Sequence, residues 1–205
     1  DWTAFNLAPA DGIALLERWR AWSAASSPSE RLRWRERIDR ERVESLGLSA
    51  FFERHPTLSP PLVFAPSTAH YSWSKGVKML GIGRDRLRLI PGRAMRLDID
   101  ALSEALDDCV RTRRPVLMAV GVFGSTEFGT IDPLDALADL RERMRARGLG
   151  FALHADAAWG GYLCTLFRSE DGALRDADAV GREFARFPSS AVHAAVGGLT
   201  RMDSV

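Results

Sequence analysis

The segment HADAAWGG, residues 154–161, places a carboxylate, Asp156, where the chain leaves a short apolar run, LGFAL. A carboxylate at the end of a buried strand loses hydration, and this is costly unless a cation meets it. An arginine of the protein could be that cation. The protonated ring nitrogen of a bound cofactor is the functional alternative, because at about 4 Å and an effective dielectric near 20 the attraction is about 4 kcal/mol. Such a pair keeps a pyridinium ring protonated.

Two further segments place polar residues just after apolar runs. His70 follows PLVFAP, and the loop GSTEFGTIDP, which contains Ser125, Thr126 and Asp132, follows PVLMAVGVF. A flat imidazole can stack on a flat cationic ring and can relay a proton near neutral pH. Each residue also has an ordinary interpretation, since a lone histidine often only starts a helix and an Asp-Pro pair is a good helix start. Their occurrence together with Asp156 is what favours a ligand site.

The elements that must position these residues alternate between strand and helix from residue 61 onward. We expect strands at 61–66, 86–91, 115–123 and 149–153, and helices at 67–83, 98–113 and 134–148. This alternation predicts an α/β fold with a mostly parallel sheet and helices on both faces. Ligands of such sheets bind outside the carboxyl ends of the strands. The three polar segments all fall just past predicted strand ends, so we expect them to converge.

The first 60 residues follow a different pattern. We expect a helix over 11–22, a loop over 23–30 and a long helical stretch over 31–55, in which Arg and Glu alternate at spacings of three and four. That alternation is typical of a solvated, ion-paired helix rather than of a nucleic-acid-binding stripe. We therefore divide the chain into a helical N-terminal segment, 1–60, and an α/β domain, 61–205.

Length and composition set the remaining limits. The 205 residues are enough for one large domain or a piece of a larger one, and the net charge of +1 gives no bias toward polyanions. Cys109 and Cys164 lack the spacing of a disulfide framework or a zinc site. There is no basic-then-apolar leader and no run of about 18 apolar residues. We expect a cytoplasmic protein with no metal, nucleic-acid or membrane partner.

The motifs AHYSWSKG, GSTEFGTIDP and HADAAWGG, in this order and spacing, resemble those of the pyridoxal-phosphate-dependent group II amino-acid decarboxylases. That family includes the aromatic-amino-acid, tyrosine and glutamate decarboxylases. The resemblance runs from about Pro61 to Val205. It implies a type I, aspartate-aminotransferase-like large domain that is incomplete on its C-terminal side. It also implies pyridoxal 5'-phosphate as cofactor, an L-amino acid as substrate and a homodimer.

The resemblance assigns roles to particular residues. Asp156 matches the residue that pairs with the pyridine nitrogen, and Ala158 matches one that packs against a ring face. His70 matches the histidine that stacks on the other face, near the departing carboxylate, so His70 and Asp156 are the implied catalytic residues. The other cofactor-binding positions are Ser125, Thr126 and His154, and Asp132 and His154 match positions that orient the cofactor pocket.

The sequence departs from the family pattern in two places. The family holds its cofactor through a lysine in an Asp-Pro-His-Lys-like motif, after a segment resembling RMDSV, residues 201–205, with which this sequence ends. The only lysines, Lys75 and Lys78, do not match that residue. The family also has a Ser/Gly-rich turn whose helix N-terminus holds the phosphate. Here the stretch reads NLAPADGIALL, in which Pro9 lacks an amide proton and Asp11 would repel a phosphate.

Two hypotheses follow from these observations. In the first, the chain is part of a functional decarboxylase whose lysine lies elsewhere. In the second, it is a non-catalytic relative that keeps the fold for assembly or regulation. Another type I pyridoxal-phosphate lyase also fits the motifs.

Overall fold

The computed structural model describes residues 2–184 and 188–205. Its centre is a four-stranded parallel sheet in the order β2-β1-β5-β6. β1 and β5 are short apolar runs, and every residue of β1 is buried, as expected for a sheet covered on both faces. This confirms the predicted α/β class. The strands of this sheet are β1 (Leu62–Pro66), β2 (Leu87–Ile90), β5 (Val116–Val122) and β6 (Ala152–Asp156).

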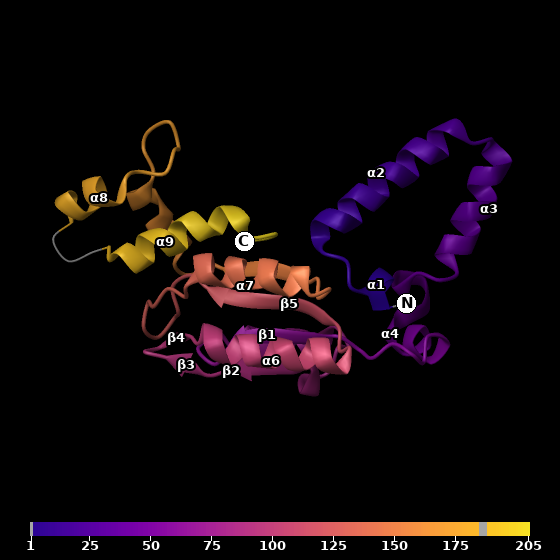
Figure 1. Cartoon of the computed structure of the whole chain (residues 1–205), viewed down its shortest axis with the longest axis horizontal. Helices are drawn as coiled ribbons and strands as arrows, with labels where there is room; N and C mark the ends of the chain where they lie inside the picture. The colour runs from indigo at the N-terminus through magenta and orange to yellow at the C-terminus, as the bar shows by residue number, and fades with distance from the viewer. Residues whose placement is uncertain (1, 185–187) are drawn as a thin grey trace.

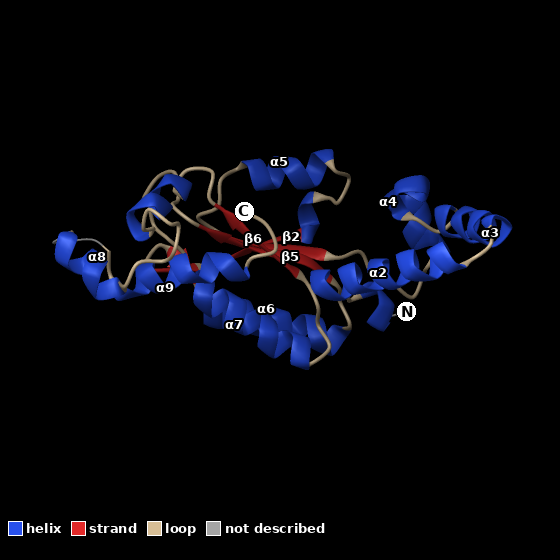
Figure 2. Cartoon of the chain, turned by 90° about the horizontal axis from the view of Figure 1, so that it is seen from above, coloured by secondary structure: helices blue, strands red, loops and turns tan. Residues whose placement is uncertain are grey.

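Helices cover both faces of the sheet. α6 (Ile99–Thr112) and α7 (Leu134–Ala146) lie on one face, and α5 (Ser72–Met79) lies on the other (Figure 2). The Asp98 carboxylate caps α6 by accepting hydrogen bonds from the Asp100 and Ala101 amides. α9 (Ser190–Gly198) packs against α7 (Figure 1). The apolar side chains that α6 and α7 bury against the sheet include Leu102, Leu106, Leu134, Leu137 and Leu140.

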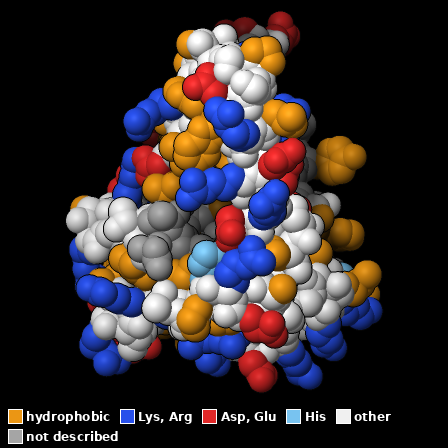
Figure 3. All heavy atoms as spheres, turned by 90° about the vertical axis from the view of Figure 1, so that its right-hand side faces the viewer, with side chains coloured by type: hydrophobic (Ala, Val, Ile, Leu, Met, Phe, Trp, Pro, Cys, Tyr) orange, Lys and Arg blue, Asp and Glu red, His pale blue; other side chains and the backbone are white. Residues whose placement is uncertain are grey.

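Four helices precede the sheet: α1 (Trp2–Phe5), α2 (Pro9–Ala25), α3 (Pro28–Asp39) and α4 (Val43–Arg54). α2 and α3 form a hairpin that extends away from the sheet (Figure 1), and neither contains a buried residue. Figure 3 faces this side and shows hydrophobic side chains exposed among charged ones. The predicted loop over 23–30 is shorter than expected, and the predicted helical stretch over 31–55 is two helices separated at residues 40–42.

Two boundaries in the sheet region also differ from the prediction. Strand β6 both begins and ends three residues later than predicted, at Ala152 and Asp156, so Asp156 is the last residue of the strand rather than a residue beyond its end. The cause is that the polar His154 and Asp156 share one face of the strand, while Leu153 and Ala155 are buried on the other. Helix α5 begins only at Ser72, because the preceding residues form a turn after β1.

The shorter elements complete the chain. β3 (Gly92–Arg93) and β4 (Arg96–Leu97) form a two-stranded antiparallel ribbon that the sequence did not predict, since two-residue strands have no measurable periodicity. Within residues 2–184 and 188–205, none of the helices has the length and apolar character needed to cross a bilayer. The short elements of the chain are η1 (Arg84–Arg86), β3 (Gly92–Arg93), β4 (Arg96–Leu97), η2 (Gly161–Phe167), α8 (Ala177–Glu183) and η3 (Leu199–Arg201).

The last residues of the chain extend the sheet beyond β6. Ser204 forms a parallel bridge with His154, and its carbonyl accepts a hydrogen bond from the Ala155 amide at 2.9 Å. The Asp203 carboxylate accepts hydrogen bonds at 2.7 Å from both the Leu153 amide and Arg141. Residues 203–205 therefore run beside β6 toward the edge that carries Asp156.

Candidate active site

A cavity of about 270 Å³ opens at the carboxyl ends of β1, β5 and β6. The turn after β1, the loop after β5 and the end of β6 supply its walls, as expected for a parallel sheet. Five of the six residues predicted to contact a cofactor line it: His70, Ser125, Thr126, Asp156 and Ala158. The remaining lining residues are Thr68, Ser72, Val122, Gly124 and Trp159.

Two glycines bring the walls of this cavity together. Gly124, in the loop after β5, has a φ of +89°, which favours glycine. A Cβ added to Gly160, in the loop after β6, would lie 2.1 Å from the Phe123 carbonyl oxygen and 2.8 Å from the Cα of Gly124. The two loops are thus in backbone contact, and the HADAAWGG segment needs its first glycine for this approach.

Asp156 projects into the cavity from the last position of β6. Its Oδ2 accepts a hydrogen bond from the indole Nε1 of Trp73 at 2.9 Å, and its Oδ1 accepts a longer one, at 3.4 Å, from the Ala158 amide. Among the ion pairs of the described residues, none involves Asp156. The sequence analysis left open an arginine as the partner of Asp156. In the structure the partner is instead a neutral donor, the indole N–H of Trp73.

His70 lies at the cavity wall in the turn between β1 and α5 and is exposed to solvent. Its Nδ1 is 3.3 Å from the Ser72 amide, which donates to it, so the neutral ring carries its proton on Nε2. The ring packs against Tyr71 with a centroid distance of 4.0 Å. The ammonium group of Lys75 lies 4.3 Å from the centroid of the same Tyr71 ring. Neither Lys75 nor Lys78 lines the cavity.

The loop after β5 is held by hydrogen bonds at both ends. The Ser125 hydroxyl is buried and lies 2.8 Å from the Thr130 hydroxyl, whereas Thr126 is exposed. Asp132 is buried beneath the loop and accepts hydrogen bonds at 2.7 Å from the Leu97 and Val122 amides. Burial raises the pKa of Asp132, and the two amides oppose that shift. Asp132 thus joins the β3–β4 ribbon to β5 and does not line the cavity.

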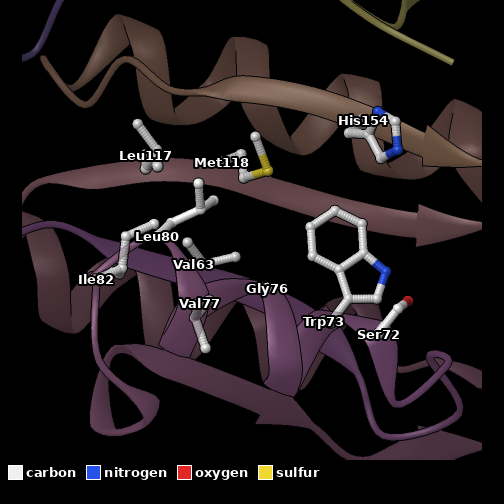
Figure 4. Close-up of a pocket in the computed structure, with 10 residues that line it drawn as sticks. All are labelled: Val63, Ser72, Trp73, Gly76, Val77, Leu80, Ile82, Leu117, Met118 and His154. Carbon is white, nitrogen blue, oxygen red and sulfur yellow. The ribbon is translucent and has the colours of Figure 1, made fainter. Parts of the chain in front are cut away.

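His154 lies outside the polar cavity. It shares a face of β6 with Asp156, and its Nδ1 lies 2.9 Å from the Ser204 hydroxyl. Its ring lines a neighbouring apolar cavity of about 350 Å³, together with Trp73 and residues of α5 and β5 (Figure 4). Trp73 lies between the two cavities, because it lines the apolar one while its indole nitrogen contacts Asp156.

Sequence reasoning missed four polar or aromatic contributors to the site, namely Thr68, Ser72, Trp73 and Trp159. Thr68, Ser72 and Trp159 lie one or two residues from predicted site residues, so their proximity was the available signal. The Thr68 hydroxyl is buried, lies in the cavity wall and has no hydrogen-bond partner among the described residues. Nothing in the spacing of AHYSWSKG indicates that the indole of Trp73 reaches the end of β6.

Comparison with known proteins identifies the family. A family model described as "Pyridoxal-dependent decarboxylase conserved domain" matches residues 49–189, a range that contains every residue lining the polar cavity. The chain belongs to this family. The resemblance inferred from the three motifs is thus confirmed.

Individual decarboxylases are similar to parts of the chain. It is 41% identical over 108 residues to an L-tyrosine decarboxylase of Enterococcus faecium, a match that covers 52% of this chain and 18% of that protein. It is 42% identical over 107 residues to an L-tyrosine decarboxylase of Levilactobacillus brevis, covering 52% and 17%. The chain thus spans less than a fifth of the length of these relatives.

A solved decarboxylase shares the fold. The structure of Catharanthus roseus tryptophan decarboxylase in complex with L-tryptophan matches with a TM-score of 0.53 at 21% identity. The match covers 82% of this chain and 29% of that one.

The decarboxylase pattern at the amino end, where a helix N-terminus holds the phosphate, is not reproduced in this structure. Residues 6–12 lie near Gly150, where an added Cβ would meet the Asn6 carbonyl oxygen at 2.5 Å and the Ala8 nitrogen at 2.7 Å. Asp11 forms an ion pair with Arg145 at 2.8 Å. Gly150 precedes β6, so the start of α2 lies at the amino edge of the sheet, opposite the cavity.

Proposed function

We propose that this chain supplies the cofactor-binding part of a pyridoxal-phosphate-dependent decarboxylase that releases the α-carboxylate of an L-amino acid as carbon dioxide. The observation that carries the proposal is the Asp156 carboxylate, which lies at a cavity wall without a cationic partner among the described residues. A buried or half-buried carboxylate left in this state favours a cationic ligand. Membership of the decarboxylase family makes a pyridinium ring the ligand of choice.

The cavity residues fit the cofactor. The cavity volume of about 270 Å³ lies just below the usual range for ligand pockets, about 300–1,000 Å³, which suits one six-membered ring with short substituents. Asp156 would pair with the ring nitrogen, with Ala158 and His70 on the two ring faces. Since residues 6–12 do not reach the cavity, we infer that hydroxyl groups of the cavity wall hold the phosphate. The unpartnered Thr68 hydroxyl and the exposed Thr126 are the candidates.

Pyridoxal phosphate, when bound, supplies a protonated ring that takes up the electron pair left by departing carbon dioxide. The residues of this chain supply orientation and proton control. Asp156 keeps the ring nitrogen protonated, because its negative charge is not neutralised by an arginine. His70 has its Nδ1 occupied by the Ser72 amide, so its Nε2 is free to hold a proton and to deliver it to the carbon that loses carbon dioxide.

The remaining parts of such an enzyme lie outside these residues. Neither lysine lines the cavity, so the lysine that the family uses to hold the cofactor would come from sequence outside this segment. We also propose a homodimer in which partner loops complete the site. The exposed aromatic side chains of Phe128, Trp159 and Tyr162, in the loops after β5 and β6, support this proposal.

The test compares the wild-type protein containing this chain with Asp156→Ala, using Glu104→Ala on the exposed face of α6 as the control. Carbon dioxide release is measured from a panel of L-amino acids that includes tyrosine, tryptophan, glutamate and aspartate, with and without added cofactor. We expect Asp156→Ala to abolish release with unchanged circular dichroism, and Glu104→Ala to behave as wild type. Near-normal turnover of Asp156→Ala would refute the assigned role. Cofactor binding without release from any amino acid would instead support the non-catalytic relative.

A further inference from the structure

The contact between Trp73 and Asp156 joins two elements that are far apart in the sequence. Trp73 lies on α5, which covers one face of the sheet, and Asp156 ends β6. The indole Nε1 donates to Oδ2 of Asp156 at 2.9 Å, a normal length for a strong N–H···O hydrogen bond. In Figure 4 the indole rises from α5 toward the ring of His154, and the two ring centroids are 5.5 Å apart. Trp73 therefore contacts β6 at two residues, Asp156 and His154.

The two oxygens of Asp156 are left in different states by this contact. Oδ2 has a short, well-directed donor, whereas Oδ1 has only the 3.4 Å contact from the Ala158 amide, at the limit of a hydrogen bond. A carboxylate held through one oxygen cannot rotate freely about its last bond. Oδ1 is thus the oxygen available to a ligand in the polar cavity, which both Asp156 and Ala158 line.

The chemistry of the donor is as important as its position. An indole N–H is neutral and has no acceptor function, so it fixes the carboxylate without cancelling its charge. An arginine at the same place would orient the group equally well, but it would compete with a cationic ligand by supplying the positive charge itself. Trp73 therefore orients Asp156 and leaves its full negative charge for the ligand.

We propose that Trp73 is a positioning residue that acts through Asp156: its indole N–H holds Oδ2 so that Oδ1 meets the protonated ring nitrogen of the cofactor. This inference rests on the proposed function, because the ring nitrogen belongs to the cofactor proposed there. Packing alone does not account for the contact, since a phenylalanine would fill most of the same space without a donor. The consequence is specific, because Trp73 strengthens the interaction with the ring nitrogen and not with the rest of the cofactor.

The first test detects the hydrogen bond in the full chain without cofactor. The sequence has six tryptophans, and Trp73→Phe assigns one indole N–H signal in a ¹⁵N spectrum. We expect Asp156→Ala to shift that signal upfield more than any of the other five. An unshifted Trp73 signal would overturn the proposal.

The second test isolates the ring nitrogen. Dissociation constants are measured for pyridoxal 5'-phosphate and for its 1-deaza analogue, in which a C–H group replaces the ring nitrogen. We expect Trp73→Phe to weaken binding of pyridoxal phosphate about tenfold, as for loss of one hydrogen bond to a charged group, and to change binding of the analogue less than about twofold. In an Asp156→Ala background the same substitution should have no further effect. Trp34→Phe, on the exposed hairpin helix α3, is the control and should leave both constants unchanged.

The outcomes separate the two proposals. If Trp73→Phe weakens binding of both compounds equally, Trp73 has a purely structural role and the inference is overturned. If it weakens neither, the contact does not act on the ligand and the inference is also overturned. If the wild-type protein binds both compounds equally well, Asp156 does not contact the ring nitrogen, and the proposed function fails together with the inference built on it.

Discussion

Substitution of Gly160 by alanine should separate the two loops that form the cavity. Gly160 has a φ of −90° and a ψ of −5°, which any residue adopts, so the backbone itself tolerates a side chain. The added Cβ, however, would lie 2.1 Å from the Phe123 carbonyl oxygen. Reaching an ordinary van der Waals contact, which begins at 3.4 Å, requires a shift of about 1.3 Å, and the atoms that the Cβ would meet belong to the backbone, which cannot rotate away.

The size of the effect follows from this overpacking. An enlarged residue in a well-packed site costs about 1–3 kcal/mol. For a chain of this size each kcal/mol lowers the melting temperature by about 2–4 °C, so we expect Gly160→Ala to melt about 2–12 °C below wild type. The loops that move carry Ser125, Thr126 and Ala158, so the affinity for pyridoxal phosphate should fall as well.

The neighbouring glycine is a matched control. A Cβ at Gly161 would meet only the Ala157 Cβ, at an ordinary distance of 3.6 Å. Both variants are compared with wild type by thermal unfolding followed by circular dichroism, and by cofactor titration. We expect Gly161→Ala to melt within about 1 °C of wild type. If Gly160→Ala did the same, the loops would not be in backbone contact and this reasoning would be wrong.

Two further predictions concern buried groups. Asp132→Asn leaves one of the Leu97 and Val122 amides without an acceptor, so urea unfolding at pH 7 should show a loss of about 1–3 kcal/mol. Burial raises the pKa of Asp132 above its unfolded value, so wild-type stability falls as the pH rises from about 4 through the raised pKa. The difference in unfolding free energy between wild type and the non-titrating variant should therefore shrink as the pH rises above about 4, and a constant difference would contradict this. Burial also raises the pKa of Cys109 to about 11, which leaves about 0.1% thiolate at pH 8. Iodoacetamide should therefore modify the less buried Cys164 first in the native protein and both cysteines alike in urea, and equal native rates would contradict the burial of Cys109.

Much of the sheet could be predicted because its signals are local. β1 and β5 are apolar runs bounded by prolines or glycines, and α6 begins at an aspartate that caps it. Convergence of His70, Ser125, Thr126, Asp156 and Ala158 followed from one topological rule, that parallel strands end at the same edge. These features need no knowledge of how the elements pack.

The remaining features depend on packing and could not be predicted. The polar residues at the start of HADAAWGG suggested that the strand ends before His154. Instead His154 and Asp156 continue the strand, because their neighbours Leu153 and Ala155 are buried in the core. The contact of Trp73 with Asp156 spans 83 positions in the sequence and depends on where α5 lies on the sheet. The path of residues 6–12 to the amino edge also depends on a long-range contact, with Gly150.

The two glycines that flank β6 have a consequence for how this segment can change in evolution. Gly150 is fixed against the backbone of Asn6 and Ala8, and Gly160 is fixed against that of Phe123. Within β6, alternate residues point to opposite sides, so deleting a single residue of the strand before Asp156 would turn its carboxylate into the hydrocarbon interior. A deletion or insertion of two would restore the original side. Where homologues differ in the length of this strand, we therefore expect them to differ by an even number of residues, since only an even difference keeps the Asp156 carboxylate on the same face of the sheet.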